Sequence, residues 1–355
     1  MEDKIYNDAI GLLSNLIRIE SFSGQEALAA DCMQKFLIQR SMRPQRYGNN
    51  IVVYNIHFDE NKPSLVLNSH LDTVKPNASY TRDPFHADTE DGKMYGLGSN
   101  DAGGPLVSLL SAFRILQERD DLPINLIFIA SAEEENSGKG GIESVFSKIP
   151  VPDLAIVGEP TLMRAAVSEK GLLVIDGLIK GKAGHAARNE GENAISKALP
   201  DIQWFNTYKF PKVSDTLGEV NMNLTVLKAG ELHNTVPDVC TYTVDIRLTD
   251  SYTHEEVLDI IRANVIAEIT PRSIRLKPSL TPVNHPVRAA AQSLGMELYG
   301  SPTMSDQALM PFPSIKIGPG DSARSHTANE FIYLDEIKQA IPMYVDLIKK
   351  TYQIS

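Results

Sequence analysis

Two histidines and several carboxylates stand directly after short apolar segments of this sequence. His70 and Asp72 follow the apolar run 65–68, and Asp101 follows the glycine-rich turn 96–98 at the start of a mostly apolar stretch. A neutral imidazole, a carboxylate that orients it and a second carboxylate on another element are what a divalent metal ion requires. These residues therefore predict a metal site.

Further candidate ligands follow other apolar runs in the same way. They are the acidic run 133–135, Glu159 and His326, and the apolar segments before them are 124–130, 154–158 and 314–317. In open α/β sheets, sites form at the carboxyl ends of the strands, so we expect all these side chains at one edge. An isolated His-x-Asp or acidic run is more often a surface feature, but the whole set favours a metal site.

The types and number of these ligands favour two transition-metal ions. Two histidines with mixed carboxylates suit Zn²⁺, Co²⁺ or Mn²⁺ better than Ca²⁺ or Mg²⁺. Five ligands exceed what one tetrahedral ion binds, and they fit two ions ~3.5–4 Å apart that share Asp101. Such ions lower the pKa of a bound water towards ~7, and a spare carboxylate would then serve as the general base.

Two other classes of protein fit the sequence less well than a metal enzyme does. A phosphate- or nucleotide-binding protein would use the turn Gly96-Leu97-Gly98, but the turn lacks the Gly-x-Gly-x-x-Gly and Gly-Lys-Ser patterns, and Asp101 would repel phosphate. A non-catalytic binding module would not need the intact set of candidate ligands and base.

Bulk composition restricts the class of protein further. The 355 residues carry a net charge of −11, with 42% hydrophobic and 22% charged residues and no long basic run, so nucleic acid is not an expected partner. No apolar run approaches the ~20 residues that cross a membrane, and the first residues lack a signal-peptide pattern. With two distant cysteines, Cys32 and Cys240, we expect free thiols and a cytoplasmic protein.

Helices and strands alternate along the segments that carry the candidate ligands. Apolar periodicity predicts a helix over 5–17, and Ser23 with Glu26 matches a capping box that would open a second helix ending near residue 40. A hairpin and loop are expected over 83–98, and a buried helix over 105–116. Strands are predicted over 51–56, 65–68, 124–130 and 154–158.

From residue 172 the pattern changes to strand-helix-strand-strand-helix-strand, a split βαβ arrangement. The predicted elements are 172–179, 193–205, 220–227, 239–248, 253–267 and 274–277. After residue 281 the alternation returns, with a helix over 287–294, a strand over 314–317 and a helix over 334–352. We therefore predict a doubly wound α/β domain over 1–171 and 281–355, interrupted by an inserted α+β domain over 172–280.

Five sequence blocks resemble the ligand blocks of the M20 metallopeptidase family, and most closely its acetylornithine deacetylase and succinyl-diaminopimelate desuccinylase group. The blocks are Ser69-His70-Leu71-Asp72, Gly98-Ser99-Asn100-Asp101, Ala132-Glu133-Glu134-Glu135, Gly158-Glu159-Pro160-Thr161 and Ser325-His326. The likeness covers essentially the whole chain, in order. It implies a zinc-peptidase-like catalytic domain with an inserted, ferredoxin-like dimerisation domain.

The resemblance implies a role for each block. Two Zn²⁺ per subunit, for which Co²⁺ can substitute, would share Asp101, and the full ligand set would be His70, Asp101, Glu135, Glu159 and His326. Asp72 would orient His70, and Glu134 would be the general acid/base. The family usually has Asp-Glu-Glu where this chain has three glutamates, so a slip of one residue in the register 133–135 is the alternative.

The resemblance also implies substrate contacts. His185 corresponds to a histidine of the dimerisation domain that reaches the active site of the partner subunit and stabilises the oxyanion. Asn234 lies in a similar Asn-x-x-Pro element, and Arg247 is similar to an arginine that binds the substrate carboxylate. Two further candidates in the first domain do not come from the resemblance: the turn Gly318-Pro319-Gly320 near His326, which could supply amide donors or be a plain turn, and Arg324, which stands where relatives vary.

The activity that the resemblance implies is that of a metal-dependent amidohydrolase. It would remove an acetyl or succinyl group from an N-acyl amino acid such as N-acylornithine or N-acylcitrulline, in arginine biosynthesis, and would act as a homodimer. The lysine of the Ala-Asp-Met-Lys-Gly common in such deacylases is missing after Asp101. The alternatives are a dipeptidase or aminopeptidase of the same family, and a succinyl-diaminopimelate desuccinylase of lysine biosynthesis.

Overall fold

The computed structural model describes residues 2–188 and 190–355, and the chain forms two compact units. The first unit contains the chain up to Val167, Leu280–Tyr299 and Ser305–Ser355, and the inserted unit contains Ser168–Ser279 and Gly300–Met304. The short segment Gly300–Met304 was not expected in the inserted unit. It belongs there because the Ser301 carbonyl accepts a hydrogen bond from the Lys170 amide at 3.1 Å.

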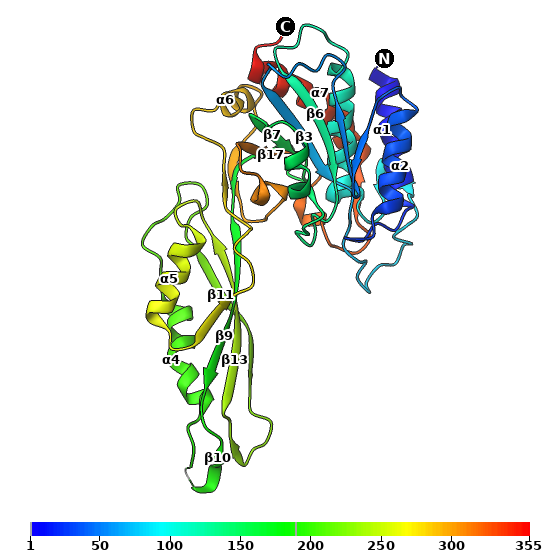
Figure 1. Cartoon of the computed structure of the whole chain (residues 1–355). Helices are drawn as coiled ribbons and strands as arrows, with labels where there is room; N and C mark the ends of the chain where they lie inside the picture. Colours follow the sequence, from blue (N-terminus) through cyan, green and yellow to red (C-terminus); the bar gives the residue numbers. More distant parts are fainter. Residues whose placement is uncertain (1, 189) are drawn as a thin grey trace. The chain divides into compact units, whose positions relative to one another are not determined.

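The first unit is built around a mixed nine-stranded sheet (Figure 1). In sheet order its strands are β1 (Gln45–Tyr47), β2 (Asn50–Tyr54), β6 (Asn125–Ser131), β3 (Ser64–His70), β7 (Leu154–Val157), β17 (Ser314–Lys316), β8 (Ala165–Glu169) and β15 (Ser279–Leu280), while β16 (Leu298–Ser301) pairs with β8. The four central strands β6, β3, β7 and β17 run parallel, and β2 and β8 flank them in the antiparallel direction. The carboxyl ends of the parallel strands therefore share one edge.

The central strands are buried on both faces, which explains their continuous apolar sequences. In β3, Leu65 and Leu67 pack into one hydrophobic cluster, whereas Val66 packs into another with Ile142 and Val145 of a short 3₁₀ segment. This alternation follows from the period of two residues along a strand. It confirms the strand predicted over 65–68 and shows that this strand is covered on both faces.

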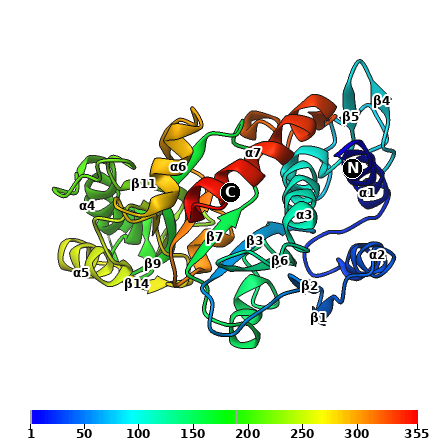
Figure 2. The same cartoon turned by 90° about the horizontal axis from the view of Figure 1, so that it is seen from above.

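Helices cover the face of the sheet to which Leu65 and Leu67 point. Figure 2 shows α1 (Glu2–Ile17), α3 (Gly104–Leu116) and α7 (Leu334–Tyr352) side by side on this face. The α3 helix is buried almost all round, because it lies between the sheet and the two other helices. At the periphery, α2 (Ala27–Ile38) packs on α1, and α6 (Pro286–Ser293) packs on α7. Among the described residues, no helix combines the length and apolar character needed to cross a membrane.

The inserted unit is an antiparallel sheet covered by two helices, and its core contains apolar side chains from both. The sheet order is β11 (Asn221–Ala229), β13 (Val239–Leu248), β9 (Gly171–Lys180) and β14 (Glu268–Pro271), and the helices are α4 (Ala194–Thr207) and α5 (His254–Asn264). Thr253 caps α5 in a capping box with Glu256. A two-stranded ladder, β10 (Gly184–His185) with β12 (Thr235–Val236), belongs to the same unit. The fold class predicted from the sequence is confirmed.

Three local predictions differ from the structure. Ser23 does not cap α2: the helix begins at Ala27, and the Ser23 hydroxyl instead donates a hydrogen bond to Asp72 Oδ2 at 2.7 Å. The strand predicted over 274–277 is wrong, since the pairing with β9 is made earlier, by β14. Strand β8 was missed because Val167 is the only one of its five residues that is typical of strands.

Asp201 of α4 is a buried carboxylate that joins the helix to the rest of the inserted unit. It accepts hydrogen bonds from the amides of Ile266 and Ala267 at 3.0 and 3.1 Å and from the Tyr242 hydroxyl at 3.1 Å. Asp201→Ala leaves these donors without their acceptor, so we expect it to lower the free energy of unfolding by about 2–4 kcal/mol.

This stability prediction can be measured by urea unfolding followed through the fluorescence of Trp204, because the chain has only one tryptophan and it lies on α4. The matched control is Asp259→Ala on the exposed side of α5, for which we expect a change within about 0.5 kcal/mol. Equal effects of the two substitutions would contradict the structural role of Asp201.

Candidate metal centre

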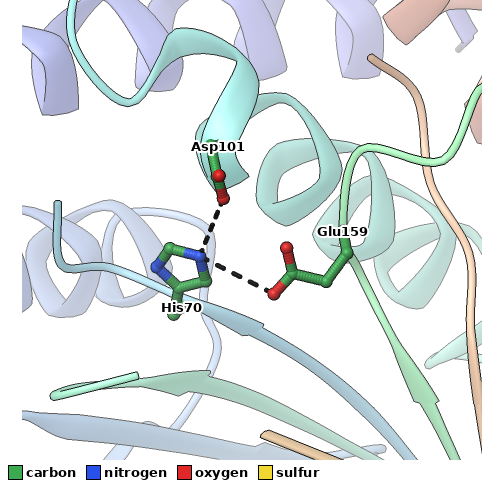
Figure 3. Close-up of side chains that lie close together, drawn as sticks. All are labelled: His70, Asp101 and Glu159. Carbon is green, nitrogen blue, oxygen red and sulfur yellow. Dashed lines mark hydrogen bonds and ion pairs between the residues drawn. The ribbon is translucent and has the colours of Figure 1, made fainter. Parts of the chain in front are cut away.

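His70 is the buried centre of a first ligand cluster. It ends β3, and its Nδ1 lies 2.9 Å from the carbonyl oxygen of Asp72. A carbonyl only accepts, so Nδ1 donates the proton, and Nε2 is the atom that could bind a metal ion. Nε2 lies 3.3 Å from Asp101 Oδ1 and 3.7 Å from Glu159 Oε1 (Figure 3). Glu159 follows β7, and Asp101 precedes α3, so three separate elements meet here.

A second ligand cluster shares Asp101 with the first. His326 Nε2 lies 3.1 Å from Glu135 Oε2 and 3.7 Å from Asp101 Oδ2. The two oxygens of the Asp101 carboxylate thus face two different histidines. Glu135 follows β6, and His326 lies in the segment after β17. Each cluster offers three donor atoms close enough together to bind one ion.

The electrostatics of the clusters fit divalent cations. Burial raises the pKa of Glu134 and of Glu159 well above the usual range, and neighbouring carboxylates add to both increases. The hydrogen bond to Glu135 raises the pKa of His326 to about 9. This crowd of negative charge attracts protons, and divalent cations would compete for the same positions. The donor set of imidazole and carboxylate suits Zn²⁺ or Co²⁺.

Buried carboxylates hold the backbone of the 133–135 segment. Asp72 accepts hydrogen bonds from the amides of Glu134 and Glu135 at 3.0 and 3.1 Å, and Glu26 accepts the Glu133 amide at 3.3 Å. The Asp72 carboxylate lies 3.5 Å from His70 Nδ1, farther than its own carbonyl oxygen. Asp72 thus contacts His70 chiefly through its carbonyl, and its carboxylate positions the acidic segment.

The side chains of the acidic segment point in three directions. Glu135 faces His326, and Glu134 Oε2 lies 3.9 Å from His70 Nε2. Glu133 Oε2 accepts a hydrogen bond from the Gly140 amide at 3.0 Å and so closes the loop after β6. Glu135, and not Glu134, is thus the partner of His326, whereas a slipped register would make Glu134 that partner; the roles of Glu135 as ligand and Glu134 as base stay predictions.

Three residues around the ligands were given no role from the sequence. Glu330 is buried and accepts hydrogen bonds from the amides of Asn100 and Asp101, and burial raises its pKa to about 8, with a further increase from Asp101. The Asn100 side chain bonds to the backbone of Asp321 in both directions, at 3.0 and 3.1 Å. Asp306 accepts hydrogen bonds from Asn68 and Ser131, which lie near the ends of β3 and β6.

Comparison with known proteins identifies the family. The model of peptidase family M20/M25/M40 matches residues 66–350, which is most of the chain. The chain belongs to this family. As an M20 member it is a hydrolase of amide bonds, and the resemblance seen in its ligand blocks is confirmed.

The names of similar proteins indicate different activities. The probable carboxypeptidase of Paracoccidioides brasiliensis strain Pb03 is 26% identical, over 98% of this chain and 86% of that protein. The LysW-lysine/LysW-ornithine hydrolase of Sulfurisphaera tokodaii is 27% identical, over 96% and 94%. The acetylornithine deacetylase of Proteus mirabilis is 26% identical, over 80% and 79%.

Solved structures of M20 proteins share the fold of this chain. A tripeptidase from Staphylococcus aureus matches with a TM-score of 0.77 at 21% identity, covering 98% of this chain and 99% of the other. A Bacillus subtilis protein described as a dinuclear metal binding peptidase matches with a TM-score of 0.74 at 14% identity, covering 99% and 100%. At these identities the likeness shows the fold.

The substrate contacts implied by the M20 resemblance fall into two groups. In the inserted unit, exposed His185 of β10 lies beside Asn234, whose carbonyl accepts the Ala186 amide at 3.1 Å. Arg247 of β13 is paired with Asp245, through Nε at 2.8 Å and a terminal nitrogen at 3.1 Å. The roles of these residues stay predictions.

In the first unit, Arg324 and Gly318 already have internal partners. Arg324 forms two hydrogen bonds with Glu336 of α7, at 2.6 and 2.8 Å. The Gly318 amide donates to the Thr161 hydroxyl at 3.0 Å, and a Cβ on Gly318 would lie 2.5 Å from the Glu159 carbonyl oxygen. Gly318 therefore supports the segment that carries Glu159, and the roles of Arg324 and Gly318 towards substrate stay predictions.

The two neighbouring glutamates should respond differently to substitution. Glu135→Gln replaces a negatively charged candidate ligand by a neutral amide, so we expect the protein to bind one Zn²⁺ ion instead of two. Glu134→Gln should retain both ions and lose turnover by about 10²–10⁴-fold, since proton transfer is lost. Metal content by elemental analysis and hydrolysis rate measure the two effects.

The control is Glu133→Gln, which keeps an oxygen for the Gly140 amide and should bind both ions. The reverse pattern, with metal lost in Glu134→Gln and retained in Glu135→Gln, would assign the slipped register to this chain.

Proposed function

We propose that this M20 protein is a two-metal amidohydrolase that removes an acetyl or succinyl group from an N-acyl amino acid. The observation that carries the proposal is the Asp101 carboxylate, whose two oxygens face His70 in one cluster and His326 in the other. A carboxylate in this position is suited to bridge two ions. The ions would be Zn²⁺, two per subunit, with Co²⁺ as a substitute.

The first ion would be held by His70, Asp101 and Glu159, and the second by Asp101, Glu135 and His326. When bound, such ions polarise the amide carbonyl and lower the pKa of water, so that attack on the carbonyl becomes possible near neutral pH. The protein supplies the positions of the ligands. It fixes them at the ends of parallel strands and through the hydrogen bonds of Asp72 to the acidic segment.

Glu134 would be the general acid/base. It stands beside the first cluster, 3.9 Å from His70, without being needed in either set of three ligands. Burial raises the pKa of its carboxyl group well above the usual range, which brings it closer to that of the groups with which it exchanges protons. We infer that Glu134 takes a proton from the attacking water and returns it to the leaving amine.

An N-acyl amino acid is the substrate class that we favour. The acetylornithine deacetylase of Proteus mirabilis acts, by its name, on such a compound, and it matches 80% of this chain. A substrate of this class carries a free carboxylate, for which Arg247 is the proposed partner, with His185 and Asn234 as further contacts. The products would be acetate or succinate and an amino acid such as ornithine or citrulline, as in arginine biosynthesis.

Peptide hydrolysis is the second candidate function. The probable carboxypeptidase of Paracoccidioides brasiliensis matches 98% of this chain, a larger share than the deacetylase does. The hydrolase named for LysW-lysine and LysW-ornithine matches 96%. All these activities cleave an amide bond and release an amino acid, so the metal centre serves each of them equally well.

We also propose that the protein is a cytoplasmic homodimer formed through the inserted unit. The first strand in its sheet order, β11, exposes Val226 and Leu227, and the neighbouring helix α4 exposes Ile195 and Leu199. Apolar side chains on an edge strand and an adjacent helix are suited to a second copy of the same unit. Free thiols such as Cys240 are compatible with a reducing compartment.

A substrate panel separates the deacylase from the peptidases. The Zn²⁺- or Co²⁺-loaded protein should hydrolyse acetyl- or succinyl-ornithine, acetyl- or succinyl-citrulline or succinyl-diaminopimelate faster than dipeptides, and a chelator should abolish the activity. Arg247→Ala should raise KM about 10–100-fold, because a charge-assisted pair with the substrate carboxylate is lost. Turnover of dipeptides alone would remove the deacylase proposal.

The dimer proposal predicts that Leu227→Glu yields a monomer in analytical ultracentrifugation, since a charge would be buried in the contact. The matched control is Val283→Glu, which alters another exposed apolar side chain, in the first unit, and should leave the dimer intact. A monomeric wild-type protein, or a dimer unaffected by Leu227→Glu, would count against this surface.

A further inference from the structure

Glu330 is a buried carboxylate that connects two metal-ligand segments. Its side chain is 2% exposed, and it lies four residues after His326, directly before β18 (Phe331–Tyr333). Its Oε1 accepts hydrogen bonds from the Asn100 amide at 2.8 Å and the Asp101 amide at 2.9 Å. One oxygen therefore holds two successive amides at the point where the chain presents Asp101.

The backbone of Glu330 holds the other end of the same loop. Its carbonyl oxygen accepts a hydrogen bond from the Gly96 amide at 3.0 Å. Within the loop, Gly98 has a φ of 75°, and a Cβ at this position would lie 2.5 Å from Thr73 Cγ2. The loop 96–101 thus contains a left-handed backbone conformation that few residues other than glycine adopt. Glu330 binds this loop at both ends.

The position of this loop decides the geometry of both clusters. Asp101 Oδ1 lies 3.3 Å from His70 Nε2, and Asp101 Oδ2 lies 3.7 Å from His326 Nε2. Metal–ligand distances vary by only about 0.2 Å, so a small displacement of the Asp101 backbone would disturb two ions at once. Because Glu330 belongs to the His326 segment, its bonds fix Asp101 and His326 relative to each other.

We propose that Glu330 is a positioning residue that places the bridging carboxylate of Asp101 through the backbone amides of Asn100 and Asp101. Glu330 is not itself a metal ligand in this proposal, and it acts on the metal centre through Asp101. The inference rests on the metal centre proposed above. It predicts that what matters at position 330 is a hydrogen-bond acceptor of the length of glutamate.

The test is Zn²⁺ binding by isothermal titration calorimetry to metal-free full-length protein. Glu330→Ala should weaken the binding of at least one of the two ions about 10–100-fold, the range found when groups that orient metal ligands are removed. Glu330→Gln keeps an acceptor oxygen of the same length, so its Zn²⁺ affinities should stay within about threefold of the wild type. The absorption spectrum of the Co²⁺-loaded forms gives an independent readout of ligand geometry.

The matched control is Asp8→Ala, which removes a carboxylate of α1 that pairs with Arg40 and Arg114. It should lower the thermal midpoint and leave both Zn²⁺ affinities unchanged. If circular dichroism shows that Glu330→Ala is unfolded, Glu330→Asp replaces it, because the shorter side chain withdraws the acceptor and should weaken Zn²⁺ binding in the same way.

The outcomes separate the two proposals. If the wild type binds no Zn²⁺, the metal centre fails and the role of Glu330 falls with it. If the wild type binds two ions and the Ala or Asp variant binds them equally well, only the positioning role is overturned. The same holds if Glu330→Gln loses as much affinity as Glu330→Ala, or if Asp8→Ala weakens Zn²⁺ binding to the same extent.

Discussion

Repulsion among crowded carboxylates is the constraint on which the first unit depends. Asp101, Glu134, Glu135 and Glu159 gather around two histidines, and four ionised carboxylates carry a charge of −4. Without compensation such a cluster takes up protons, as the increased pKa of buried Glu134 and Glu159 indicates. Two divalent cations carry +4, which balances the cluster. The fold must therefore hold these side chains together against their own repulsion, which the two cations proposed above would relieve.

The protein meets this demand with further carboxylates that bind backbone amides. Asp72 holds Glu134 and Glu135, Glu26 holds Glu133, and Glu330 holds Asp101. Hydrogen bonds to a charged acceptor are roughly twice as strong as neutral ones, which favours Asp72 as the firmest of these three anchors. The same charges make the interior more negative, which disfavours the metal-free state. The same carboxylates thus hold the loops and increase the attraction for cations. Their negative charge destabilises the protein when no metal is bound.

The sequence predicts the ligands better than the residues that place them. The structure brings His70, Glu135 and Glu159 to the two clusters because each lies at or just after the end of a parallel strand, and parallel strands bring their ends to one edge by geometry alone. Glu330 gave no signal, since it acts on amides about 230 residues earlier in the chain, and hydrogen bonds to amides leave no pattern in side-chain types. Ser23 misled for a related reason: its local spacing matched a helix cap, but its hydroxyl bonds to Asp72.

The chain leaves the first unit and returns to it at two positions that are neighbours in the sheet. The chain leaves the first unit after Val167 and returns at Leu280, and the Thr281 amide donates to the Val167 carbonyl at 2.8 Å. The two crossing points are therefore neighbours in the sheet, and strands β3, β6 and β7, at whose ends candidate ligands lie, all belong to the first unit. Residues proposed to bind substrate, such as Arg247, lie on the insertion, whose core is separate. The candidate metal ligands lie in the first unit and the proposed partner of the substrate carboxylate lies in the inserted unit, so the two sets of residues belong to separate cores.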